Sequence, residues 1–219
     1  MEGSLSEVEN IAFEAKKSSL STKVFSGKYA VEENFKTLNG DNSPNILHIA
    51  THGFFFPDLQ QTENENISIN LSEYNSFKLS DNSLNRAGLL FTGANAAWSR
   101  ESIPEGVEDG ILTAYEVSHV PLPNTKLVVL SACETGLGEI KGSEGVFGLQ
   151  RAFKTSGVEY LLMSLWQVPD YETAEFMEEF YKNLFLSNDI EGNFVTTQNY
   201  MKKKYLKDPY KWAAFVLMR

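Results

Sequence analysis

The stretch that decides the fold is Lys126-Leu-Val-Val-Leu-Ser-Ala-Cys-Glu-Thr-Gly136. Its apolar run, 127–130, is typical of a buried strand. The run ends in Ser131, Ala132 and Cys133, the only cysteine of the chain. A side chain at a strand end, followed by polar and turn residues, is expected to reach a cleft. Cys133 is therefore a candidate nucleophile, and the alternative is an inert core cysteine, because free cysteine packs like a small hydrophobic residue.

A second apolar run, Asn45-Ile-Leu-His-Ile-Ala-Thr-His-Gly53, places an imidazole at its end. Parallel strands end at the same edge of a sheet, so His52 and Cys133 can meet although they are far apart in the sequence. A thiol beside an imidazole is a nucleophile with its base. The amides of Gly53 and Cys133 could form an oxyanion hole. Taken alone, His52 is equally well explained as a polar histidine at a strand end.

Three other features have structural explanations that compete with functional ones. His48 and His52 would lie roughly 13 Å apart on a strand, too far for one metal ion. We therefore expect no metal site and assign His48 to a structural hydrogen bond. The glycine-bearing loop 136–143 lacks the Gly-Lys-Ser/Thr ending of a phosphate loop, and we expect it to shape a substrate groove. Asp170 precedes a helical run, so it is an N-cap or an anion facing a substrate cation, and the two roles are compatible.

Composition limits the function. Hydrophobic residues make up 42% of the 219 residues, as in a folded domain. The net charge of −10 argues against nucleic acid as a partner, and the run 202–204 of three lysines fits a solvated helix face. No apolar run reaches the ~18 residues of a membrane span. The single cysteine and the absence of a signal-peptide pattern predict a cytoplasmic location.

Helix-like and strand-like segments alternate along the chain, which indicates an α/β architecture. We expect helices at 5–18, 29–38, 110–117, 144–155, from Asp170 onward, and at 195–206. Strands are expected at 46–50, 88–92, 127–130, 158–166 and 212–217, with a short extended piece at 23–26. The polar stretch 57–85 lacks a period and is predicted to be a long loop, and 94–108 is predicted to be irregular.

Four motifs in this order resemble the CHAT family, whose members are caspase-like domains related to caspases and separases. They are His52-Gly53 after a strand, Ser131-Ala132-Cys133 after a strand, Ser164-Leu-Trp-Gln-Val-Pro-Asp170, and the terminal Trp212-Ala-Ala-Phe215. The resemblance covers about 5–217. It implies a caspase-like α/β/α sandwich with a mainly parallel central sheet. It also implies that residues 1–219 are a single domain, the C-terminal part of a longer protein.

The same resemblance implies a cysteine endopeptidase that needs no cofactor. His52 and Cys133 would be its catalytic dyad, with oxyanion donors at the Gly53 and Cys133 amides. The expected partners are a protein or peptide substrate and an upstream tetratricopeptide-repeat region or activator. Such domains serve bacterial defence or cell-death systems in which a partner regulates the protease. No segment before Glu2 matches the first strand of the caspase-type sheet.

The resemblance also gives expectations about the substrate. Asp170 matches an acidic residue that helps separases hold a basic P1 residue. Ser131 stands where caspases carry a glutamine that binds an acidic P1 residue, and the sequence around Cys133 departs from the caspase pattern. A basic or uncharged P1 residue is therefore favoured. Two alternatives remain open at this point, a catalytically silent interaction module and a cysteine-dependent hydrolase or transferase that acts on another ester or amide.

Overall fold

The computed structural model describes residues 2–56, 80–131 and 144–219. For residues 2–4 and 144–147 only the backbone is considered. The predicted loop 57–85 lies mostly outside these ranges, and the predicted glycine-bearing loop 136–143 lies entirely outside them.

The centre of the molecule is a four-stranded sheet in the order β1-β5-β6-β7. Its strands are β1 (Ile46–Ile49), β5 (Leu127–Leu130), β6 (Tyr160–Ser164) and β7 (Phe215–Met218). The pairs β1–β5 and β5–β6 are parallel, and β7 joins β6 antiparallel. All four β5 side chains are buried, because a central strand covered on both faces needs a continuous apolar run. The sequence run 127–130 therefore predicted this strand with its correct bounds.

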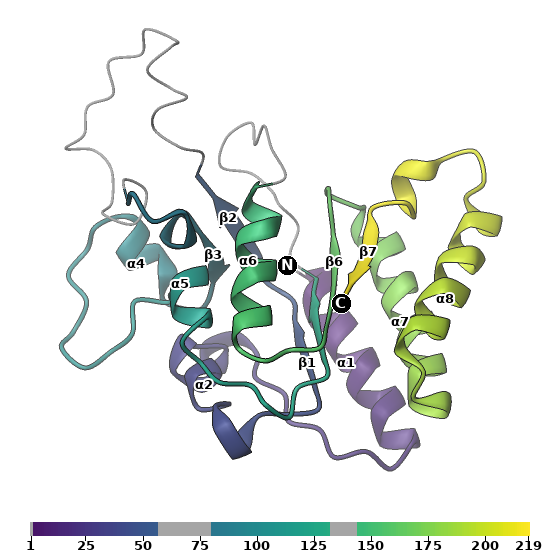
Figure 1. Ribbon diagram of the computed structural model, residues 1–219, viewed down its shortest axis with the longest axis horizontal. Helices are drawn as coiled ribbons and strands as arrows, with labels where there is room; N and C mark the ends of the chain where they lie inside the picture. The colour runs from purple at the N-terminus through teal and green to yellow at the C-terminus, as the bar shows by residue number, and fades with distance from the viewer. Residues whose placement is uncertain (1, 57–79, 132–143) are drawn as a thin grey trace, which may run out of the picture.

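Helices cover both faces of this sheet (Figure 1). Leu127 and Val129 of β5 face the core beneath α1 (Glu2–Lys17), α7 (Asp170–Ser187) and α8 (Ile190–Lys204). Val128 and Leu130 face the opposite core, beneath α2 (Glu32–Lys36), α5 (Ala114–Val117) and α6 (Glu144–Thr155). The alternation follows from the two-residue period of a strand. The predicted α/β/α sandwich with a mainly parallel central sheet is confirmed.

A second, antiparallel sheet extends from the end of β1. It has the order β2-β3-β4 and consists of β2 (His52–Phe55), β3 (Ala87–Leu90) and β4 (Ile111–Thr113). A Cβ atom on Gly88 would lie 2.4 Å from the Leu112 carbonyl oxygen and 2.8 Å from the Phe54 ring. Only a glycine allows this approach, so Gly88 lets the Phe54 ring pack directly over β3.

Several predicted boundaries are wrong for local reasons. The predicted helix 110–117 begins as β4, because Thr113 and Glu116 form a capping box that starts α5 only at Ala114. The predicted helix 195–206 starts earlier, at Ile190, because the Asp189 side chain accepts from the Gly192 amide. The stretch 94–108 contains a short helix, α4 (Ala94–Trp98). Short 3-10 turns occur at Gly27–Tyr29, Gly40–Asn42, Ser83–Arg86 and Pro209–Lys211.

Two further segments differ from expectation. The predicted helix 29–38 is reduced to α2, which Val31 precedes as N-cap without a side-chain hydrogen bond. Residues 23–26 form no strand, although Ser26 has an extended backbone.

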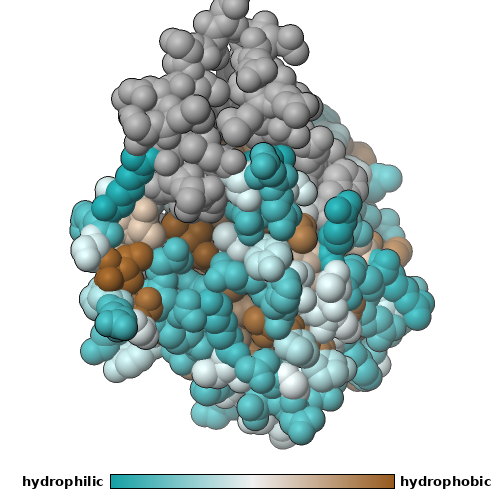
Figure 2. Space-filling view, turned by 60° about the vertical axis from the view of Figure 1, so that its left-hand side comes forward, coloured by the Kyte–Doolittle hydropathy of each residue, from teal (hydrophilic) through white to brown (hydrophobic). Residues whose placement is uncertain are grey.

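The lysine run 202–204 lies on the surface. Lys202, Lys203 and Lys204 are exposed in the last turn of α8, as predicted for a solvated helix face. On the face shown in Figure 2, hydrophobic residues form small patches between hydrophilic ones. None of the described helices is long and apolar enough to cross a membrane.

Candidate active site at the strand ends

The carboxyl ends of β1, β5 and β6 lie side by side. Ile49 pairs with Leu130, and Leu130 pairs with Met163 on the other side. Beyond the paired residues, the Ser131 amide donates to the Ile49 carbonyl oxygen at 2.9 Å. The chain segments that lead to His52, Cys133 and Asp170 therefore all leave the sheet at one edge. This edge of a parallel sheet is where α/β proteins bind their ligands.

His52 is exposed and is the first residue of β2, not the last residue of β1. The difference arises because the chain turns after Ile49 and starts a new strand, whose partner β3 follows only after residue 80. The Thr51 hydroxyl donates to the Leu90 carbonyl oxygen and so fixes the residue before His52. The imidazole is thus attached to a strand held by main-chain pairing.

The Gly53 amide faces away from β3. The Phe56 amide donates to the Arg86 carbonyl oxygen at 2.8 Å, and the register continues with Phe54 opposite Gly88 and His52 opposite Leu90. Bonded and non-bonded pairs alternate in an antiparallel ladder. Gly53, which is opposite Leu89, therefore belongs to a non-bonded pair. Among the described strands β2 is at the edge of this sheet, so the Gly53 amide points to the side on which no described strand pairs with β2.

Of the other predicted site residues, the structure describes Ser131 and Asp170. Cys133 lies outside the described residues. Ser131 is half-buried directly after β5, and its hydroxyl donates to the Glu7 carboxylate at 2.9 Å. Asp170 is exposed and is the first residue of α7. The prediction that it is the N-cap is wrong by one residue, because Pro169 is the N-cap, but its charge still favours the positive end of the helix dipole.

Glu7, His48 and Tyr181 form a buried polar network behind the strand ends. The sequence predicted only the hydrogen bond of His48. Glu7 Oε1 lies 3.1 Å from His48 Nε2, at ion-pair distance but without hydrogen-bond alignment. His48 Nδ1 lies 3.0 Å from the Tyr181 hydroxyl, which confirms the predicted structural hydrogen bond of His48. Burial, and then the Glu7 charge, raise the pKa of Tyr181 well above its usual value.

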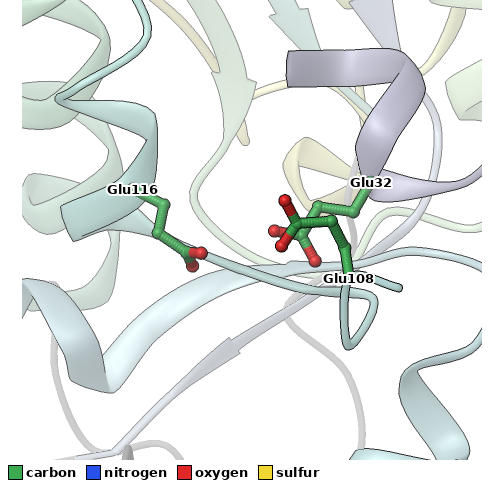
Figure 3. A group of neighbouring side chains, drawn as sticks. All are labelled: Glu32, Glu108 and Glu116. Carbon is green, nitrogen blue, oxygen red and sulfur yellow. The ribbon is translucent and has the colours of Figure 1, made fainter. Parts of the chain in front are cut away.

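The carboxylates of Glu32, Glu108 and Glu116 form another cluster and offer ligand atoms within 4.8 Å of one another. Figure 3 shows the three side chains, which come from α2, the loop before β4, and α5, converging on one point. Lys36 already supplies a cation there. Its ammonium lies 2.7 Å from Glu32, 2.7 Å from Glu108 and 3.1 Å from Glu116. The cluster is therefore explained by an internal ion pair.

The α/β/α sandwich with a mainly parallel sheet is consistent with a caspase-like fold. The CHAT-domain family model matches residues 1–219, and the chain belongs to this caspase-like family.

Two tetratricopeptide repeat proteins match about half of this chain. The chain is similar to tetratricopeptide repeat protein 28 of Homo sapiens, with 30% identity over 115 residues. It is similar to the Mus musculus protein of the same name, with 29% identity over 109 residues. These matches cover 51% and 49% of this chain but 4% of each relative. The chain thus spans only a small part of the length of these relatives.

Proposed function

We propose that this domain is a cysteine endopeptidase whose dyad is His52 and Cys133. The observation that carries the proposal is the pairing of the β1 and β5 ends through the Ser131 amide and the Ile49 carbonyl oxygen. Cys133 follows Ser131 by two residues, and His52 follows Ile49 by three. A thiol and an imidazole on such short extensions from adjacent strand ends have the reach of a catalytic pair.

The proposed reaction has two stages. His52 takes the thiol proton, and the Cys133 thiolate attacks the carbonyl carbon of the scissile peptide bond. The carbon–nitrogen bond breaks as the imidazolium gives its proton to the leaving amine, which leaves a thioester. Water then attacks the thioester with His52 as base. The thioester bond breaks, the acid product leaves and the thiol is regenerated.

The negative oxygen of each tetrahedral intermediate needs donors that are already oriented. The Gly53 amide suits this role because it points away from β3, to the side of β2 on which the described part of the chain pairs no strand. We propose the Cys133 amide as the second donor. A glycine next to the histidine also lets the substrate carbonyl approach the main chain closely.

We propose that Asp170 and Ser131 contribute to the P1 side of the substrate site. Both follow strands that end at the same edge. The Ser131 hydroxyl donates its hydrogen to the buried Glu7 carboxylate, so it can offer a substrate an acceptor but not a donor. An acceptor and the Asp170 carboxylate together favour a basic P1 residue over an acidic one.

A regulatory partner is part of the proposal. The curated relatives are named as tetratricopeptide repeat proteins, which supports a repeat region or an activator as the partner of this domain. We propose that such a partner controls access to the site in a bacterial defence or cell-death system, in a reducing cytoplasm.

The test is cleavage of a peptide library varied at P1, by the wild type and by Cys133→Ala in parallel. Cleavage by the wild type alone supports the proposal and gives the P1 preference. Equal cleavage by both proteins contradicts it. Absence of cleavage together with absence of Cys133 labelling by peptide electrophiles favours the interaction module instead.

A further inference from the structure

Glu7 is a buried carboxylate that joins the amino-terminal helix to the strand ends. It lies on α1, and its side chain is 6% exposed. One carboxylate oxygen accepts from the Ser131 hydroxyl at 2.9 Å, and the other lies 3.1 Å from His48 Nε2. Ser131 follows β5 and His48 belongs to β1. A single side chain thus contacts both strands whose ends lead to the proposed dyad.

The network continues into α7. Burial raises the pKa of Tyr181, so its hydroxyl keeps its proton and can donate to His48 Nδ1, 3.0 Å away. Tyr181 itself is 1% exposed and packs edge-on against the His48 ring. The His48 ring that Glu7 contacts is therefore positioned by α7 as well as by β1.

Packing does not require a carboxylate at this position. Glu7 shares the inner face of α1 with Ile11 and Ala15, which pack toward the core, as expected at a spacing of four residues. An apolar residue would avoid the cost of removing a charge from water. What the carboxylate adds is a directional hydrogen bond to Ser131, two residues before Cys133.

We propose that Glu7 is a positioning residue for the active site. It does not touch the reacting atoms. It holds the Ser131 hydroxyl, directly after β5, and contacts His48 of β1, so it sets the relative positions of the two strand ends from which the proposed dyad residues extend. Through Glu7, α1 thereby helps to position the active site. The inference rests on the proposed function for its catalytic consequence, whereas its structural part is measurable without turnover.

The experiment compares Glu7→Gln, Ser131→Ala and the double variant. The matched control is Glu9→Gln, which removes the same charge from an exposed position on the same helix. We expect Glu7→Gln to lower kcat about tenfold, the size expected for one hydrogen bond to a charged group, with KM within about twofold. Because Glu7 acts through Ser131, the double variant should fall no more than about twofold below Ser131→Ala. Glu9→Gln should match the wild type.

Hydrogen exchange supplies the readout that does not depend on activity. Exchange of the Ser131 amide should become about tenfold faster in Glu7→Gln, while the amides of β6 serve as the internal reference for global unfolding. Faster exchange at Ser131 alone, in a wild type that cleaves nothing, supports the coupling while the proposed function fails. Unchanged kcat and exchange in Glu7→Gln overturn the proposal. So do additive losses in the double variant, or equal losses in Glu9→Gln.

Discussion

The Ser131 amide donates a hydrogen bond of 2.9 Å to the Ile49 carbonyl oxygen, one residue beyond the last paired positions of β5 and β1. This contact extends the parallel pairing to the point where both strands leave the sheet. It therefore fixes the starting points of two short segments, one leading to His52 and one to Cys133. The proposed chemistry depends on the separation of these two segments.

Replacement of His52 tests whether the imidazole acts on the thiol. We expect His52→Ala to lower kcat/KM on a cleaved peptide by about 10²–10⁴-fold, the usual contribution of a general base. The matched control is His119→Ala. His119 is exposed, and its ring contacts the Tyr115 carbonyl oxygen within its own helical turn. If His52→Ala keeps more than half of the wild-type kcat/KM, His52 has no catalytic role.

Replacement of Asp170 tests the P1 preference. Because Asp170 is exposed and solvent screens its charge, we expect Asp170→Asn to lower kcat/KM about threefold to tenfold for a peptide with P1 arginine. A peptide with P1 alanine should be cleaved at the wild-type rate. Glu178→Gln, at an exposed position farther along α7, is the charge-matched control. A parallel loss on both peptides would mean that Asp170 acts on the fold and not on the substrate.

The Glu32 carboxyl group predicts a pH dependence of stability. Burial outweighs the Lys36 ammonium and raises the Glu32 pKa from 4.5 to about 7. Between these two values the unfolded chain loses this proton while the folded chain keeps it. The free energy of unfolding should therefore fall as pH rises from about 4.5 to about 7, by at most about 3 kcal/mol from this group. The pKa of Glu116 is lowered, so its contribution changes below 4.5 instead.

Urea unfolding from pH 5 to pH 8 measures this effect. Glu32→Gln stays neutral throughout, so its stability relative to the wild type should improve as pH rises. The exposed Glu105→Gln should show no such trend. A difference between Glu32→Gln and the wild type that is constant across this range would show that Glu32 does not titrate in the window.

The central sheet was predictable because its strands are covered on both faces. The run 127–130 has no polar residue, and no helical or half-exposed pattern competes with it. The pairing of strands in the second sheet was harder to predict from the sequence. β2 begins at His52 and pairs with a strand that starts at Ala87, and no local pattern indicates that pairing. His52 was consequently assigned to the end of a strand that stops at Ile49.

The positions of the site residues were inferred from strand ends, and the described part of the chain supports that principle for the segments around Ile49, Leu130 and Ser164. The sequence alone does not indicate the contact between Glu7 and Ser131. A signal for Glu7 itself was present, since a glutamate four residues before Ile11 lies on the apolar face of a helix. Its partner Ser131 is 124 residues away, and only the fold brings the two together.

Cleavage by the wild type and by Cys133→Ala of a peptide library varied at P1 tests the central claim most directly. Cys133 is the only cysteine, so the substitution removes every thiol from the protein. We predict that the wild type cleaves, with a preference for basic P1 residues, and that Cys133→Ala does not. Cleavage that survives in Cys133→Ala would contradict the account.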